Sequence, residues 1–152
     1  MPTHFPGTKR ETAALNAYIN LVRASETILD RMAADVERQG LTLGQFGVME
    51  VLLHLGPMCQ RELGEKLLRS GGNVTLVIDN LERQGWVKRE RLEGDRRKLL
   101  IRLTPEGRRL VEGAFALHVK TVMKEFGRLT PAEQEELRRL CRKLGRSTSD
   151  GK

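Results

Sequence analysis

The hydrophobic pattern of this 152-residue chain changes its period at Gly85, and this change constrains the fold more than any other feature. Before Gly85, apolar residues recur every three or four positions, which is the period of amphipathic helices. Two short strand-like runs follow at 86–91 and 98–103, with a turn-rich, charged loop at 92–97 between them. The helical period returns after Thr104. The order of segments therefore predicts a mainly α-helical protein with one small β-hairpin.

Capping signals and glycines set the ends of the predicted helices. Thr42 and Gln45 have the spacing of a capping box, which Thr130 and Glu133 repeat before the last helix. Thr104 is followed by proline, a typical helix start. The expected helices cover about 9–39, 43–55, 60–68, 74–85 and two long segments within 105–145.

The two short helices and the hairpin together indicate a DNA-binding unit. Two short helices joined by a glycine-containing break form the helix-turn-helix pattern, whose second helix suits the major groove. The net charge of the chain is +7, and residues 83–109 hold ten basic and four acidic residues, so six of those seven charges lie there. Such a hairpin suits phosphates, because released counterions drive binding. The predicted partner is therefore double-stranded DNA.

Composition and motifs argue against other classes. Aromatic residues make up 4% of the chain, too few for a single-strand stacking platform. The longest uncharged stretches, 12–22 and 39–49, fall far short of the roughly 20 residues that span a bilayer. No secretory signal is visible, and two cysteines cannot form a disulfide framework, so a cytoplasmic location is expected.

Catalytic and metal-binding patterns are likewise absent from the sequence. It contains no Gly-rich phosphate loop and no nucleophile elbow, so we expect neither an enzyme nor a cofactor. His4, His54 and His118 are far apart and lack metal-ligand spacing, which predicts no metal site.

Three runs around the hairpin resemble the signature of the multiple-antibiotic-resistance-regulator (MarR) family. They are Leu81–Val87 (LERQGWV), Gly94–Lys98 (GDRRK) and Leu103–Gly107 (LTPEG), with Arg89 between the first two. The resemblance covers roughly 15–144 in matching order. It implies a single winged helix-turn-helix domain that binds a pseudo-palindromic operator as a homodimer. By the same resemblance, 42–104 is the DNA-binding region, and 9–39 and 105–145 are dimerisation helices.

The resemblance also assigns roles to individual residues. Asp95 and Arg97 match a wing pair in which the aspartate braces the arginine and the arginine enters the minor groove, which attracts guanidinium groups where it is narrow. The alternative is a solvated hairpin tip. On the second helix, Asn73 can pair with an adenine edge, while Thr75 and Leu76 offer methyl groups to thymine. The full set of predicted DNA contacts is Arg69, Ser70, Gly72, Asn73, Thr75, Leu76, Arg89, Asp95, Arg96, Arg97 and Lys98.

The second helix departs from the family pattern, because it has no Lys or Arg between Arg69 and Arg83. Gly71 and Gly72 stand where relatives carry larger polar residues. These glycines allow close approach of the helix N-terminus to a phosphate, or they serve only the turn. This departure affects the prediction of which bases are contacted and leaves the prediction of DNA binding unchanged.

The prediction of how the protein is regulated depends on fewer residues. Most relatives are repressors that a small effector, often phenolic or otherwise aromatic, releases from DNA. Tyr18, Met32 and His54 are candidates for an effector pocket, with ordinary core packing as the alternative. Cys59 precedes a helix that begins with Gln60-Arg61, and a thiol at such a position can react as a thiolate. A redox-sensing regulator that uses Cys59 is therefore one alternative function, and a non-specific DNA-packaging protein is another.

Overall fold

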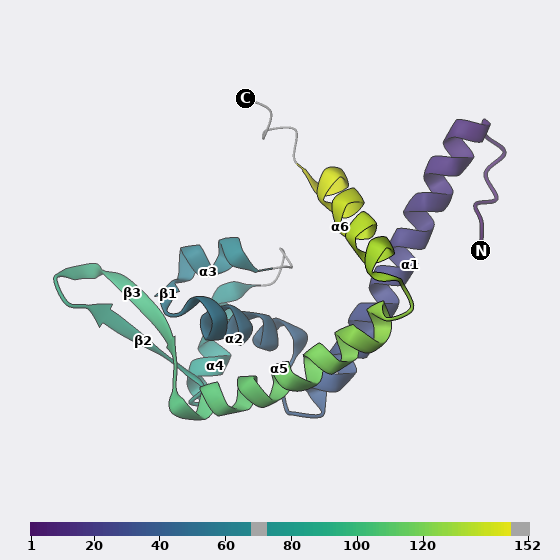
Figure 1. The fold of residues 1–152 in the computed structure, drawn as a ribbon. Helices are drawn as coiled ribbons and strands as arrows, with labels where there is room; N and C mark the ends of the chain where they lie inside the picture. The colour runs from purple at the N-terminus through teal and green to yellow at the C-terminus, as the bar shows by residue number, and fades with distance from the viewer. Residues whose placement is uncertain (68–72, 147–152) are drawn as a thin grey trace. The chain divides into compact units, whose positions relative to one another are not determined.

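The computed structural model of the chain describes residues 1–67 and 73–146 (Figure 1). Tertiary contacts divide the chain into two compact units, Met1–His118 and Val119–Lys152, with the boundary inside the fifth helix. No helix in the described ranges has the length and apolar character needed to cross a membrane. In chain order the elements are α1 (Lys9–Glu37), α2 (Leu43–Leu55), β1 (Met58–Cys59), α3 (Gln60–Lys66), α4 (Val74–Arg83), β2 (Val87–Leu92), β3 (Asp95–Leu103), α5 (Pro105–Phe126) and α6 (Pro131–Gly145).

The predicted helix starts at Thr42 and Thr130 are confirmed. The Thr42 hydroxyl accepts the N–H of Gln45 at 3.1 Å, and the Gln45 side chain accepts the N–H of Thr42 at 2.9 Å. Thr130 and Glu133 form the same reciprocal pair at 3.2 and 2.8 Å. These bonds satisfy backbone donors that the first turn of a helix leaves without partners.

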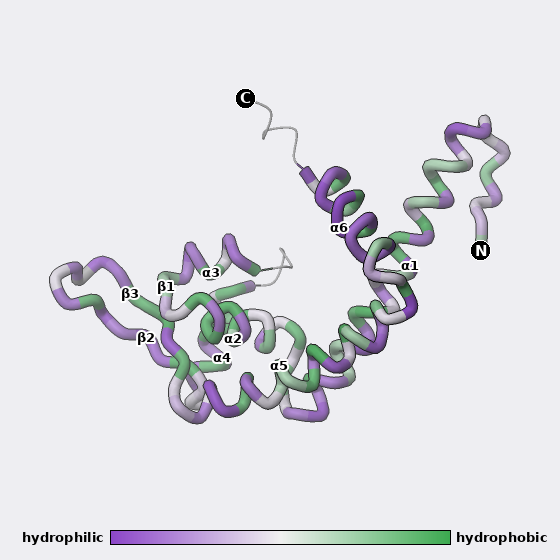
Figure 2. The backbone as a smooth tube through the Cα atoms, in the orientation of Figure 1, coloured by the Kyte–Doolittle hydropathy of each residue, from purple (hydrophilic) through white to green (hydrophobic). Residues whose placement is uncertain are grey.

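One apolar core fills the first unit, and α2 contributes more of it than any other element. Phe46, Val48, Met49 and Leu52 of α2 are all at most 2% exposed, and α2 packs against α1, α3, α4 and β3. Figure 2 shows hydrophobic residues along α2 and mainly hydrophilic ones along the β2–β3 hairpin. The core residues are Val36, Leu41, Phe46, Val48, Met49, Leu52, Met58, Leu63, Ile78, Leu81, Val87, Ile101, Leu103, Val111 and Ala114. The shared core holds the two short helices and the base of the hairpin in one arrangement.

The antiparallel sheet has the strand order β1-β3-β2, and it corrects the sequence prediction in two ways. The charged loop expected at 92–97 is mostly strand, because β2 runs to Leu92 and β3 starts at Asp95. Gly94 makes this tight turn possible with φ of +93°, a conformation that favours glycine. Strand β1 was not predicted, since two residues are too short to show a period. It pairs Met58 with Ile101 and Cys59 with Leu100.

Helix α5 begins directly beside the base of the hairpin. Gly107 lies so close to the start of β2 that a Cβ atom there would overlap the carbonyl of Trp86. The Thr104 hydroxyl donates to the carbonyl of Gly85 at 2.6 Å and accepts the N–H of Gly107 at 3.1 Å. The LTPEG run is therefore the joint at which the hairpin leaves the core and α5 begins.

Candidate nucleic-acid interface

Helix α4 presents one face to the core and another to solvent, as a recognition helix requires. Ile78 and Leu81 are fully buried and form the inward face of this helix. Leu76 is 54% exposed. Its methyl groups are available to contact a thymine methyl in the major groove.

The start of α4 gives structural roles to two of the predicted DNA contacts. Asn73 is the N-cap, and its side-chain oxygen accepts the N–H of Leu76 at 3.2 Å. The Thr75 hydroxyl accepts a hydrogen bond from Gln60 of α3 at 2.6 Å, which joins the two short helices. Contact of either residue with a base stays a prediction. The other candidates before this helix, Arg69, Ser70 and Gly72, lie outside the described residues.

Arg89 of β2 holds the hairpin to the recognition helix. Its Nη2 lies 2.7 Å from Oδ1 of Asp79, and its Nη1 lies 3.0 Å from Oε1 of Glu82. The other carboxylate oxygen of Glu82 accepts the backbone N–H of Arg89 at 3.1 Å. Both acidic residues belong to α4, so three polar contacts connect one residue of the wing to one helix face. We call this group of Arg89, Asp79 and Glu82 the clamp.

Burial and charge both act on the clamp. The Arg89 side chain is 21% exposed, about half the exposure of its two partners. Desolvation is the largest single influence and disfavours the charged form, but the hydrogen bond to Asp79 and the charges of Glu82 and Asp79 together outweigh it. The pKa of Arg89 is therefore raised above its usual value. Arg89 therefore stays charged and engaged within the protein, while its direct contact with DNA stays a prediction.

The tip of the wing is organised differently. Oδ1 of Asp95 accepts the backbone N–H of Arg97 at 3.0 Å, so the aspartate supports the main chain rather than the guanidinium. Among the described side chains, Asp95 and Arg97 form no ion pair. Arg97 and Lys98 are exposed, while the side chain of Arg96 lies outside the described part of the structure. The tip therefore presents solvated cations, and contact with a DNA groove can still set the positions of their side chains.

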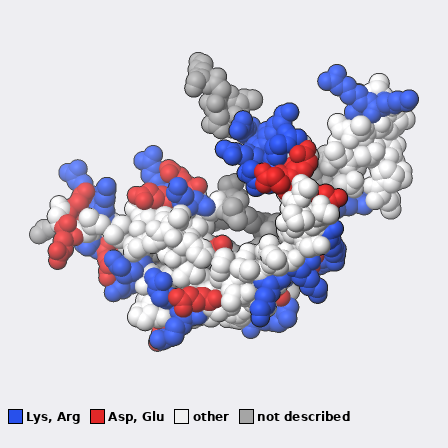
Figure 3. Space-filling model, in the orientation of Figure 1, with Lys and Arg blue, Asp and Glu red and all other residues white. Residues whose placement is uncertain are grey.

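Acidic side chains lie among the basic ones along the wing (Figure 3). Lys88 Nζ lies 2.8 Å from Oε1 of Glu90, and Arg102 Nε lies 2.9 Å from Oε2 of the same residue. Hydrogen bonds from Lys88 and then Arg102 lower the pKa of Glu90. Two cations thus share one carboxylate at the base of the wing, whereas the cations at the tip carry their charge towards solvent.

The structure does not bring the three predicted effector residues into one described cavity. Tyr18 is 63% exposed and lines a cavity between the N-terminal segment and α1 that includes neither Met32 nor His54. Met32 is buried, and the ring of His54 packs edge-on against Phe115 at 4.5 Å. Tyr18 and Met32 are also about 21 Å apart along the helix axis, at 1.5 Å per residue. A small molecule bound to one chain cannot contact both.

Cys59 is the N-cap residue of α3, but its surroundings differ from those the sequence indicated. The thiol is half-buried and donates to Oε1 of Glu62 at 3.2 Å. Arg61, the cation expected near the sulfur, is instead paired with Glu65 at 3.5 Å. No group of three or more His, Cys, Asp or Glu side chains in the described ranges is placed to hold a metal ion.

Sequence reasoning missed the contribution of the two acidic residues of α4 to the site. In the sequence Asp79 belongs to no recognisable motif, and Glu82 stands within the LERQGWV run. One signal was present, since the spacing of Asp79 and Glu82 puts both carboxylates on one helix face. The cation that pairs with this face is Arg89 of a separate strand, so only the tertiary structure identifies it.

Comparisons with known proteins agree with this geometry. The model of the MarR family matches residues 41–99. The uncharacterized HTH-type transcriptional regulator YkoM of Bacillus subtilis strain 168 is 33% identical over 132 residues, which cover 87% of this chain and 86% of the relative.

Solved structures extend the match to most of the chain. BpsR of Bordetella bronchiseptica, whose DNA binding is regulated by 6-hydroxynicotinic acid, is 26% identical with a TM-score of 0.76, and the match covers 97% of this chain and 99% of that one. AbsC, a MarR family transcriptional regulator from Streptomyces coelicolor, has a TM-score of 0.80 at 23% identity over 93% of this chain and 95% of that one. The fold is that of a winged-helix regulator.

Proposed function

This chain belongs to the MarR family of transcriptional regulators, and we propose that it is a homodimeric repressor that a small organic effector releases from its operator. The observation that carries the proposal is the clamp. Arg89 joins the recognition helix and the wing into one reading unit, with Leu76 exposed on the helix and Arg97 and Lys98 exposed on the wing.

The recognition helix and the wing tip contact different parts of DNA. A recognition helix enters the major groove, and an arginine at the wing tip enters the adjacent minor groove. A protein that packages DNA without sequence preference does not need a fixed relation between two such elements. The clamp therefore favours sequence-specific binding.

The second unit supports the dimer. No described residue of α6 is buried, although Leu137, Leu140 and Leu144 recur at helical spacing. Leu140 and Leu144 are 47% and 71% exposed, and Met123 at the end of α5 is 69% exposed. An apolar stripe of this kind requires a partner, and a second copy of the chain supplies one. We expect sedimentation velocity at micromolar protein to give a dimer; a monomer at all concentrations would contradict this.

The operator tests the whole proposal. A two-fold symmetric dimer places its recognition helices about 34 Å apart, which is one turn of DNA or roughly 10 base pairs. Footprinting on promoter DNA next to the protein's own gene should protect a short pseudo-palindrome with this spacing. Protection without a discrete boundary would support the packaging alternative.

Release by an effector is the second part of the proposal. It is supported by the similarity to BpsR, whose DNA binding a small aromatic acid regulates. The redox alternative has less support, because the neighbour of the Cys59 thiol is a carboxylate. Cys59→Ser should bind the operator like the parent, and neither should release DNA on peroxide treatment. Release by the parent alone would establish the redox alternative. Because the chain acts on the genome and has two free thiols, we propose a cytoplasmic location.

A further inference from the structure

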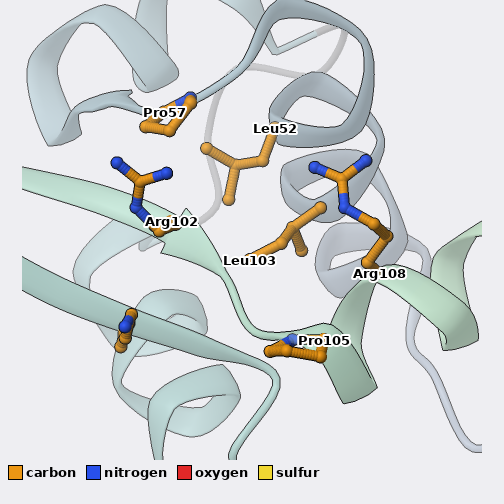
Figure 4. A pocket seen from close by; sticks show the side chains of 7 residues that line it. Leu52, Pro57, Arg102, Leu103, Pro105 and Arg108 are labelled. Carbon is orange, nitrogen blue, oxygen red and sulfur yellow. The ribbon is translucent and has the colours of Figure 1, made fainter.

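A cavity of about 420 Å³ lies at the base of the wing, between the end of α2, strands β2 and β3 and the start of α5. Part of its wall is apolar. Leu52 and Leu103 belong to the core, and Pro57 and Pro105 complete this surface (Figure 4). Its volume lies within the range of about 300–1,000 Å³ that is typical of small-molecule sites.

Three cations form the rest of the lining: Lys88 from β2, Arg102 from β3 and Arg108 from α5. In Figure 4 the guanidinium groups of Arg102 and Arg108 flank Leu52. None of the described residues that line the cavity is acidic. The wall therefore combines a positive charge on each side with an apolar surface between them.

These cations retain capacity to bind an anion. Arg102 uses Nε for Glu90, and its two terminal nitrogens have no hydrogen-bond partner in the described part of the chain. Arg108 forms a long ion pair with Glu112, with 4.0 Å between Nη1 and Oε1, which is beyond hydrogen-bond distance. Lys88 and Arg102 share the single carboxylate of Glu90.

We propose that this cavity binds a small organic carboxylate with a compact apolar body, and that this anion is the effector. This inference rests on the proposed function, because it assigns the effector a place and a chemical class. Two arginines suit a carboxylate, since the guanidinium fork matches its two oxygens. The apolar body of the ligand packs mainly against the exposed Pro57 and Pro105, with the buried Leu52 and Leu103 behind them, so a simple inorganic anion should bind less well.

The location connects the ligand to DNA binding. Lys88 and Arg102 lie on the wing strands, and Lys88 is next to Arg89 of the clamp, whereas Arg108 lies on α5. A bound carboxylate draws these cations towards the cavity and reduces the positive field at the base of the wing. Because coupling is reciprocal, operator DNA must weaken carboxylate binding by the same factor by which the carboxylate weakens operator binding.

The test uses the full-length protein and benzoate as the probe, with benzamide as a neutral molecule of similar shape. Calorimetric titration should detect benzoate binding and no benzamide binding. Methyl spectra should shift at Leu52 and Leu103 as benzoate is added. Benzoate should also lower the affinity for the footprinted operator.

Two variants should act in opposite directions. Arg108→Gln removes one charged ligand and should weaken benzoate binding about tenfold. Glu90→Gln removes the competing carboxylate from Lys88 and Arg102 and should strengthen it several-fold. Arg109, the next residue on α5, is exposed and does not line the cavity, so Arg109→Gln is the matched control and should leave benzoate binding unchanged.

Several results would overturn the proposal. Equal benzoate affinity in the parent and Arg108→Gln, or equal affinity for benzoate and benzamide, would show that the cations do not bind the carboxylate. A reduced salt dependence of operator binding in Arg108→Gln would show that Arg108 contacts a DNA phosphate instead. A protein that binds its operator but not benzoate would overturn only this inference, whereas failure to bind any discrete operator would count against the proposed function itself.

Discussion

The base and the tip of the wing use arginine and carboxylate in different ways. At the base, Arg89 contacts the carboxylates of Asp79 and Glu82 through both terminal nitrogens and is 21% exposed. At the tip, Asp95 accepts the backbone N–H of Arg97, whose side chain is exposed. The same residue types therefore fix the position of the wing at one end and leave a cation available at the other.

The difference separates positioning from reading. A rigid base reduces the entropy lost when the wing docks, because the angle between the wing and α4 is already set. The exposed guanidinium of Arg97 has no ion-pair partner among the described side chains, so it breaks no such contact when it enters a groove. We therefore expect variants at the tip to change contact with DNA and variants at the base to change placement.

The largest effect is expected for Arg97→Ala. Loss of a guanidinium from the minor groove should weaken operator binding by about 1–3 kcal/mol, the scale of one good base contact. Scrambled DNA should be affected much less, because it does not present the groove width that the arginine selects. Binding titrations against both DNAs measure this. Equal losses on operator and scrambled DNA would mean that the tip is only a charged tether.

The clamp should give the second largest effect. Arg89→Ala frees the wing and leaves two carboxylates beside DNA, so operator binding should fall about tenfold, a modest value because the ion pairs are partly exposed. Asp79→Asn is the sharper variant. It removes a negative charge, which by Coulomb attraction alone would strengthen binding, yet we expect weaker operator binding because the wing loses its support.

Salt dependence separates positioning from contact in these clamp variants. If Arg89 acts only within the protein, Arg89→Ala should leave the slope of log affinity against log salt unchanged. A slope smaller by about one would reveal a phosphate contact. Arg89→Lys keeps the charge without the fork and should restore operator binding only in part.

Asp95→Ala should have a smaller effect than either. The aspartate accepts one exposed backbone N–H, and such a hydrogen bond contributes about 1 kcal/mol. We expect operator binding to weaken several-fold although the substitution removes a negative charge. Asp95→Asn can still accept that N–H and is the control. Tighter operator binding by Asp95→Ala would show that charge outweighs the support of the turn.

Lys98→Ala should give the smallest loss of specificity. A solvated lysine at the tip that meets a phosphate contributes equally on every sequence. Its loss should reduce the salt slope by about one and leave the ratio of operator to scrambled affinity unchanged. Titrations at two salt concentrations measure both quantities, and a changed ratio would make Lys98 a sequence reader alongside Arg97.

The sequence by itself determined the order of the helices and of the two wing strands, and most of the helix boundaries. Capping boxes at Thr42 and Thr130 depend on residues three apart, and the change of period at Gly85 is visible within a short window. The LTPEG run likewise indicated the start of α5. Such features are local, because their hydrogen bonds join neighbours along the chain, and local pattern is what a single sequence reports most directly.

Tertiary structure alone decided which side chains meet. The packing of β2 against α4 turns Arg89, which is also a predicted DNA contact, towards Asp79 and Glu82. The pairing of β2 with β3 brings Arg102 next to Glu90, and the position of α5 places Arg108 at one cavity with Lys88. These residues lie on different elements, and their distances follow from how a shared core orients those elements. The spacing of residues along a sequence does not report these distances. Burial of Ile78, Leu81 and Val87 in the shared core fixes them.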